Sequence, residues 1–183
     1  CANKISYELS YRNINIISGL ALGIDACCHR GCLKGNGKTI AVLASSLDDI
    51  RPSTNKLLAG EILDNGGLLL SEYNVGHIVT RGSFPSRNRI LSGISDGIIV
   101  IEAAQKSGAL ITADLGLDQG KNVFAVPGNI HSDMSKGCHK IIKEGAKLIE
   151  NIEDILEEYN NSGFNNNKIS IEYDIKGLSD ESQ

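Results

Sequence analysis

A short apolar run that passes into a glycine-containing loop and then into a helix-length segment decides how this chain folds. The stretch reads Ile14-Asn15-Ile16-Ile17-Ser18-Gly19-Leu20-Ala21-Leu22-Gly23-Ile24-Asp25. Isoleucine favours a strand, and glycine allows a tight turn before the next element. The pattern predicts a strand over Ile14–Ser18, a loop over Ser18–Asp25, and a helix after it.

The same order of strand, polar turn and helix repeats along the chain. Further apolar runs lie at Thr39–Leu43, Leu68–Glu72, Ile98–Ile101 and Val123–Val126. These runs are continuously apolar, which is typical of strands that are covered on both faces. The sequence therefore predicts an α/β, doubly wound fold, in which a mostly parallel sheet has helices on both faces.

The ends of the chain predict one main domain and a tail. Cys1–Tyr11 is expected to form a helix that feeds the first strand, with no strand ahead of it. Apolar residues at helical spacing, from Ile152 to Tyr159, predict a last amphipathic helix, and the asparagine-rich stretch 160–167 is typical of a linker. We expect a domain over residues 1–158 and a linker or tail over residues 159–183.

Composition and charge point to a cytoplasmic protein. Its 183 residues contain no apolar run long enough to cross a membrane, and the first residues lack a secretory signal. Five cysteines, three of them at positions 27, 28 and 32, indicate reduced thiols more than a disulfide framework. The net charge is −4, but nine acids and two bases lie from Glu150 onward, so the preceding residues carry +3.

The first loop is a candidate anion site. Gly19 and Gly23 allow close backbone approach, and the N–H groups of a loop that opens a helix can face a phosphate. The spacing matches neither the dinucleotide-binding fingerprint nor a Walker motif. A tight turn that only packs the helix on the strand is the alternative interpretation.

The segment around Phe84 is the most basic part of the chain. No acid occurs between Glu72 and Asp96, whereas Arg81, Arg87 and Arg89 do. Arginine forks bind phosphates, and an aromatic face can stack a base, so the segment predicts a site for single-stranded nucleic acid. In the alternative, Phe84 lies in the core and one arginine pairs with Glu72 or Glu102.

The remaining motifs predict neither catalysis nor metal binding. Ser107-Gly108 can cap a helix or join the same cleft, and Lys121 adds a cation before the last predicted strand. Cys28, His29 and Cys32 have no zinc-site spacing, so we expect no metal. No serine-nucleophile or zinc-protease motif is present, and the carboxylates Asp25, Glu72 and Glu102 could as well orient arginines, so we expect no enzyme.

Four motifs in order resemble the DNA processing protein A (DprA/Smf) family: Ser18–Asp25 with His29, Phe84–Ile90, Glu102–Thr112 and Pro127-Gly128. The resemblance covers residues 1–158. It implies a Rossmann-like domain that lacks its first strand and an N-terminal domain, with a C-terminal winged-helix domain absent beyond the tail. It also implies single-stranded DNA binding without base specificity, a homodimer, handover of the strand to the RecA recombinase in natural transformation, and no cofactor. The DNA-binding residues carried over are Ser18, Gly19, Gly23, Asp25, Phe84, Arg87, Asn88, Arg89, Ser107, Gly108 and Lys121.

The sequence departs from the family at Leu22, where many members have a basic residue; Arg51, which replaces an aromatic, could compensate. Two other functions stay open. A phosphoribohydrolase-like nucleotide-processing enzyme would need a Pro-Gly-Gly-x-Gly-Thr loop, which this chain lacks. A protein-interaction module would use the acid-free segment to dock an acidic partner.

Overall fold

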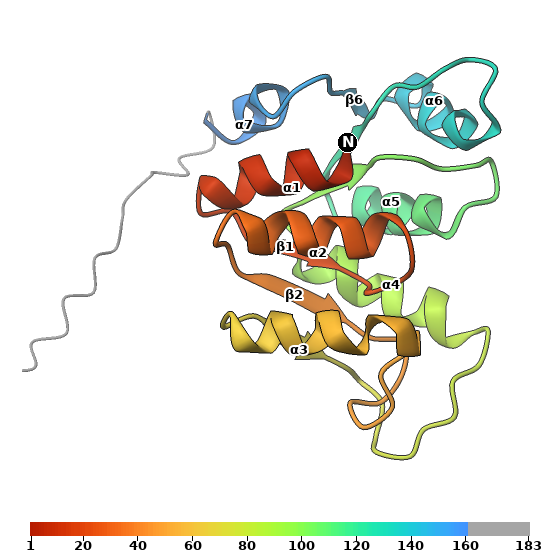
Figure 1. The fold of residues 1–183 in the computed structure, drawn as a ribbon. Helices are drawn as coiled ribbons and strands as arrows, with labels where there is room; N and C mark the ends of the chain where they lie inside the picture. Colours follow the sequence, from red (N-terminus) through yellow and green to blue (C-terminus); the bar gives the residue numbers. More distant parts are fainter. Residues whose placement is uncertain (161–183) are drawn as a thin grey trace, which may run out of the picture.

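The computed structural model describes residues 1–160, which alternate between strands and helices (Figure 1). The strands are β1 (Ile16–Ser18), β2 (Thr39–Val42), β3 (Leu68–Leu70), β4 (Gly97–Val100), β5 (Asn122–Ala125) and β6 (Lys147–Leu148). The helices are α1 (Ala2–Tyr11), α2 (Ile24–Lys34), α3 (Lys56–Asp64), α4 (Ser83–Ile94), α5 (Gly108–Asp118), α6 (Lys136–Lys143) and α7 (Glu153–Asn160). Two short 3-10 turns, Ser53–Asn55 and Asp133–Ser135, precede α3 and α6.

All strand pairs are parallel, as the sequence predicts. Hydrogen bonds join β1, β2 and β3 in one three-stranded sheet and β4, β5 and β6 in another. In the first sheet Ile17 pairs with Ile40 and Ala41 with Leu69; in the second, Ile99 pairs with Phe124. The five predicted strands are confirmed, although β1 begins two residues later than expected and β3 ends two residues earlier. β6 was not predicted, because two residues are too few to give a periodic signal.

Helices cover both faces of the strands, which explains the continuous apolar runs. In β4 and β5, Ile98 and Val123 pack into one core cluster with α5 and α6, whereas Ile99 and Phe124 pack into another with α1 and α7. A third cluster joins β2 to α2 and α3. Figure 1 shows α1, α2 and α3 in front of the strands and α4 and α5 behind them. The predicted doubly wound α/β class is confirmed.

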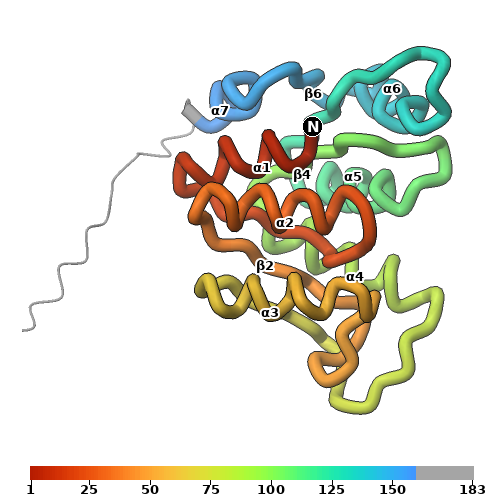
Figure 2. Tube along the Cα trace, viewed as in Figure 1, coloured from red at the N-terminus to blue at the C-terminus, as the bar shows by residue number. Residues whose placement is uncertain are grey.

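The chain path brings distant loops to one edge of the strands. Within each sheet the strands are parallel, so the loops after β1, β2 and β3 leave from one edge, as do those after β4 and β5. Hydrogen bonds from Arg87 to Gly19 and from Asn88 to Gly108 bring the two sets of loops together at the edge where ligands bind in folds of this class. The tube in Figure 2 shows the long loops after β2 and β3 lying next to each other, below the right-hand end of α3. The predicted linker or tail, residues 159–183, lies outside the described residues except for Tyr159 and Asn160, which end α7.

The core predicts a large stability difference between two hydrophobic truncations. Phe124 is 1% exposed and packs against Leu9, Ile149 and Ile152, so Phe124→Ala should lower the free energy of unfolding by about 3–5 kcal/mol. Leu57 is 82% exposed, so Leu57→Ala should change it by less than about 0.5 kcal/mol. Urea unfolding followed by circular dichroism measures both, and equal effects would contradict the assigned packing.

Candidate functional site

Five loops meet at the carboxyl edge of the strands. They follow β1, β2, β3, β4 and β5, and most of the site residues predicted from sequence lie on them or on the first turns of the helices they open. The side chains divide into two groups. One group is buried and holds the loops together; the other is exposed and free to contact a ligand.

Arg87 is the centre of the buried group. The residue is 5% exposed, and its Nη1 donates to the carbonyl oxygen of Gly19 at 2.7 Å and to that of Val42. These carbonyls lie at the ends of β1 and β2, so one guanidinium on α4 joins two neighbouring strand ends. Burial lowers the pKa of Arg87, while the carboxylate of Asp25 opposes that effect. Arg87 was predicted to contact phosphate, but the structure turns it into the protein.

The first loop is closed by its own residues. Oδ2 of Asp25 accepts hydrogen bonds from the N–H groups of Gly19 and Ala21, both at 3.1 Å. A Cβ at Gly19 would lie 2.3 Å from Nη1 of Arg87, so glycine is required here for the arginine to approach. Gly23, with φ 83°, precedes α2. The sequence predicted free N–H groups in this loop, but two of them are already satisfied by Asp25.

Asn88 links the next two loops. Its Nδ2 donates to the carbonyl oxygen of Gly108 at 3.3 Å, and its Oδ1 accepts from Nε of Arg87 at 3.3 Å. Ser107 caps α5, since its hydroxyl accepts from the N–H of Ala109 at 3.3 Å. The sequence left Ser107 open between a cap and a ligand contact, and the structure gives it the cap. Asn88, Gly108 and Ser107 thus fix the start of α5 beside α4.

Phe84 and Arg89 lie on the exposed side of α4. Phe84 is 45% exposed, so the alternative that it belongs to the core is wrong. Arg89 forms an ion pair with Glu72 through Nη2, in agreement with the alternative that one arginine is paired internally. The side chain of Arg89 is still 59% exposed, and such a surface pair is worth at most about 1 kcal/mol.

Phe84 borders a hollow that sequence analysis did not identify. The hollow has a volume of about 540 Å³ and lies between the loops after β2 and β3, lined by Asp49, Arg51, Gly76, His77, Ile78, Val79 and Phe84. Nε of Arg51 donates to Asp49 at 2.8 Å, and both side chains are partly exposed. The ring of His77 stacks on Tyr73, with centroids 4.0 Å apart. Ile78 is 82% exposed, and neither this exposure nor the shape of the hollow can be read from the sequence.

Lys121 lies away from this site. It precedes β5, so it lies at the opposite, amino edge of the strands, and its backbone N–H donates to Gly116 at the end of α5. Ser18, at the end of β1, is half-buried at the carboxyl edge. Of the eleven predicted site residues, Lys121 is the one that the structure does not bring to this edge.

His29 is a buried residue that links the elements on which the same loops begin. Oγ1 of Thr39 donates to the carbonyl of Ile16 at 2.7 Å, so Nδ1–H of His29 donates to Thr39 Oγ1, also at 2.7 Å. His29 is fully buried, and Nε2 has no hydrogen-bond partner among the described residues. Burial lowers the pKa of His29 to about 4. The neutral ring therefore ties α2 to β1 and β2.

Among residues 1–160, no group of three or more histidine, cysteine, aspartate or glutamate residues is arranged to hold a metal ion. Within the same range, none of the helices has the length and apolar character needed to cross a membrane.

Comparison with known proteins gives the family. The profile of the DNA recombination-mediator protein A family matches residues 1–160. The chain belongs to this family. DNA processing protein DprA of Streptococcus pneumoniae (strain ATCC BAA-255 / R6) is 46% identical over 144 residues, 79% of this chain and 51% of that protein. Protein Smf of Escherichia coli (strain K12) is 46% identical over 149 residues, 81% of this chain and 40% of that protein. The chain thus spans about half the length, or less, of these relatives.

Two solved structures of family members have the same fold. The X-ray structure of DprA from Streptococcus pneumoniae matches with a TM-score of 0.78 and 42% identity, over 86% of this chain and 55% of that one. DNA processing protein A from Helicobacter pylori matches with a TM-score of 0.79 and 32% identity, over 88% of this chain and 73% of that one. The latter structure is described for its single-stranded DNA binding mode. The predicted family and fold are both confirmed.

The buried position of Arg87 predicts a structural role for it. Arg87→Ala leaves the carbonyls of Gly19 and Val42 without their donor, so it should lower the free energy of unfolding by roughly 1–3 kcal/mol or more. Arg81 is exposed, and Arg81→Ala should change the same quantity by less than about 0.5 kcal/mol. Urea unfolding compares the two, and a neutral Arg87→Ala variant would show that the clamp does not hold the loops.

His29 predicts a loss of stability in mild acid. Its pKa is about 4 in the folded chain and 6.5 in the unfolded chain, so the unfolded chain binds the proton more readily between these values. The contribution of neutral His29 to the free energy of unfolding is fully present above pH 6.5 and declines as the pH falls toward 4. About 2 kcal/mol of it is lost at pH 5. Urea unfolding at pH 7.5 and pH 5 measures the fall in the free energy of unfolding between the two pH values. This fall should be about 2 kcal/mol smaller in His29→Gln than in the unmodified chain. An unchanged pH dependence in the variant would contradict the assignment.

Proposed function

We propose that this chain binds single-stranded DNA without base specificity, at the carboxyl edge of its strands. The observation that carries the proposal is the hollow bordered by the half-exposed ring of Phe84 and by Arg51. Family membership and the DNA-binding mode described for the Helicobacter pylori relative support it. Binding requires no chemical turnover, so we infer that the chain is not an enzyme.

Base stacking supplies the part of the interaction that does not depend on sequence. Every base has a flat face, and stacking on an aromatic ring is worth about 1–3 kcal/mol per base. Phe84 offers such a face, and the exposed side chain of Ile78 extends the apolar surface of the hollow. A hollow of about 540 Å³ is large enough for one unstacked base.

Exposed cations on three loops supply the contacts to phosphate. Arg51 follows β2, Arg81 follows β3 and Lys106 follows β4, and all three are exposed. Among residues 1–160, neither Arg81 nor Lys106 has an ion-pair partner, while Arg51 pairs with Asp49 through Nε and keeps its two Nη groups. Because an exposed pair is weak, a phosphate can compete for Arg51. This favours Arg51 as the cation that compensates for Leu22, which is 67% exposed in the first loop.

The buried group keeps these contacts in place. Arg87 and Asp25 satisfy backbone groups of the loop after β1, Arg87 also that of Val42 at the end of β2, and Asn88 that of Gly108 after β4. Glycines 19, 23 and 108, with Ser18 and Ser107, shape the loops, and Arg89 lies at the border of the site. Lys121 takes no part in this version of the site.

The proposal extends to the biological setting. We infer that the chain works in the cytoplasm as a homodimer, and that it hands single-stranded DNA to the RecA recombinase during recombination or natural transformation. Family membership supports this part. Light scattering of the purified chain tests the dimer, and RecA filament assembly on strands coated with the chain tests the handover. A monomer, or filaments that assemble no faster with the chain, would contradict the respective step.

Oligonucleotide binding tests the site. Fluorescence anisotropy of a labelled oligo-dT strand should show salt-sensitive binding, with the affinity lowered roughly 5- to 100-fold by Phe84→Ala. Arg51→Ala and Arg81→Ala should each weaken binding and flatten the plot of log K against log salt by about 0.7. Because we infer that the chain is not an enzyme, the oligonucleotide should be recovered uncleaved after incubation with it.

Matched controls separate the site from the rest of the surface. Tyr11 is an exposed aromatic residue at the end of α1, and Lys38 is an exposed cation just before β2, both at the amino edge. Tyr11→Ala and Lys38→Ala should bind as the unmodified chain does. Equal losses in all four variants, or no binding at low salt, would overturn the proposed site.

A further inference from the structure

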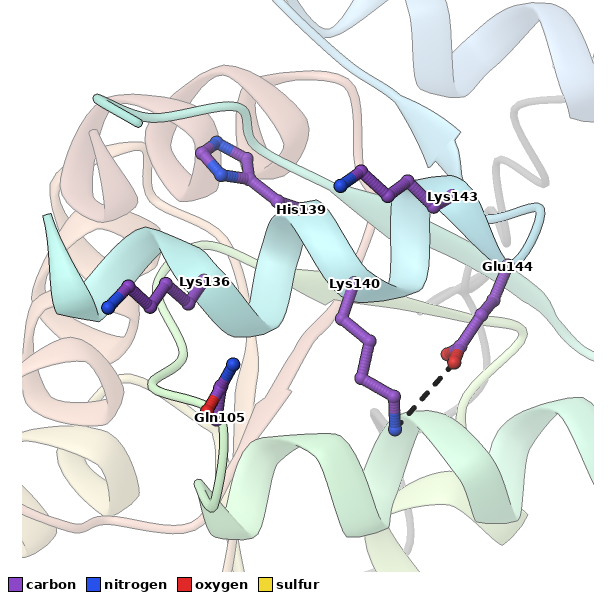
Figure 3. A pocket seen from close by; sticks show the side chains of 6 residues that line it. All are labelled: Gln105, Lys136, His139, Lys140, Lys143 and Glu144. Atoms are coloured by element: carbon purple, nitrogen blue, oxygen red, sulfur yellow. Dashed lines mark ion pairs between the residues drawn. The ribbon is translucent and has the colours of Figure 1, made fainter. Parts of the chain in front are cut away.

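Helix α6 carries a row of lysines that the site described above does not use. Lys136, Lys140 and Lys143 are spaced by four and three residues, which puts them on one face of the helix. They line a groove of about 420 Å³ together with Gln105, His139 and Glu144. Figure 3 shows the lysine side chains and Gln105 around this groove, with Gln105 on a separate loop.

The lysines are held only weakly by their neighbours. Lys136 pairs with Asp133 at 2.6 Å and Lys140 with Glu144 at 3.7 Å, and the lysine side chains are 48% and 53% exposed. Exposed pairs of this kind contribute little to stability, because solvent and salt screen them. Lys143 has no ion-pair partner among residues 1–160. The groove therefore contains three lysines and one glutamate, and its cations remain available to an external anion.

The groove opens at the same edge as the candidate site. α6 follows the loop after β5, and Gln105 belongs to the loop after β4, next to Lys106 and the cap residue Ser107. The N–H of Gly137 donates to the carbonyl oxygen of Ala103 at 2.7 Å, which fixes the start of α6 against the loop after β4. From Lys136 to Lys143 the helix rises by about 10 Å. The row thus leads away from the edge along α6.

The lining favours a phosphate backbone over a protein surface. All six lining residues are polar or charged, and the imidazole of His139 is the one ring among them. The buried centre of a protein interface is instead rich in aromatic residues and poor in lysine. Lysines in a row, with no apolar anchor, are typical of contacts to nucleic-acid phosphates, which position a strand without reading its sequence.

We propose that the α6 groove is a second phosphate-binding segment, which extends the path of single-stranded DNA beyond the hollow at Phe84. This inference rests on the proposed function. A short strand contacts only the hollow and the exposed cations of the loops. A longer strand continues past Lys106 and Gln105 onto Lys136, Lys140 and Lys143.

The test compares two strand lengths on two double variants of the full chain. Anisotropy is measured with oligo-dT of about 6 and of about 30 nucleotides, a range that brackets single-strand site sizes. K140A/K143A removes two groove lysines. K4A/K34A is the matched control, because Lys4 pairs with Glu8 at 3.7 Å with the same four-residue spacing as Lys140 with Glu144, and Lys34, like Lys143, lies in the last turn of its helix.

The proposal predicts an effect of strand length. K140A/K143A should bind the long strand several-fold more weakly, with a salt slope flatter by about 1.4, and the short strand unchanged. K4A/K34A should bind both strands as the unmodified chain does. Light scattering at the same concentrations should give one molecular mass for all three proteins.

Each other outcome overturns the groove and has its own meaning. Equal binding of the long strand by the unmodified chain and K140A/K143A removes the groove but leaves the proposed function intact. Weaker binding of both strand lengths, or weaker binding by both double variants, would show a general charge effect. Weaker binding together with a change of molecular mass would show an effect on assembly. No binding of either strand by the unmodified chain would overturn the proposed function itself.

Discussion

The buried guanidinium of Arg87 is the interaction on which the rest of the site depends. β1 and β2 end side by side, and the carbonyls of Gly19, one residue past β1, and of Val42, the last residue of β2, both accept hydrogen bonds from Arg87. One planar group with several N–H donors satisfies both at once. Both bonds come from Nη1, and Nε donates to Oδ1 of Asn88 as well, a further bond that a lysine with its single nitrogen could not add in the same geometry. Gly19 must lack a side chain, because a Cβ would occupy the space of the guanidinium.

The polar residues at the carboxyl edge therefore have different roles from the exposed residues around them. The polar residues nearest the strands are committed to the protein: Asp25 to backbone N–H groups, Asn88 to Gly108, and Ser107 to the cap of α5. A ligand therefore meets the next layer outward, where Phe84, Arg51 and Arg81 are exposed. Because the inner groups are already hydrogen-bonded to the protein, little of their ordering entropy remains to be lost when a ligand binds outside them.

The fold was largely predictable from the sequence, because strands covered on both faces leave unbroken apolar runs. β6 could not be predicted, since two residues hydrogen-bonded to β5 leave no periodic pattern. The site was predictable only in its location. Arg87 and Arg89 are two residues apart on α4, about 200° around the helix, so one turns inward and the other outward. Which of them is buried depends on how α4 packs against the strands, and composition does not contain that information. The place of Lys121 could have been inferred, because a residue that precedes a strand lies at the amino edge.

The most direct test of the account is photocrosslinking of an iodouracil-substituted single strand to the chain, followed by peptide mass spectrometry. Iodinated bases react with aromatic rings in stacking contact. The account predicts that the major adduct lies on Phe84, with any second adduct on Tyr73 or His77 beside the hollow. Adducts confined to Tyr7 and Tyr11 of α1, away from the carboxyl edge, would contradict it.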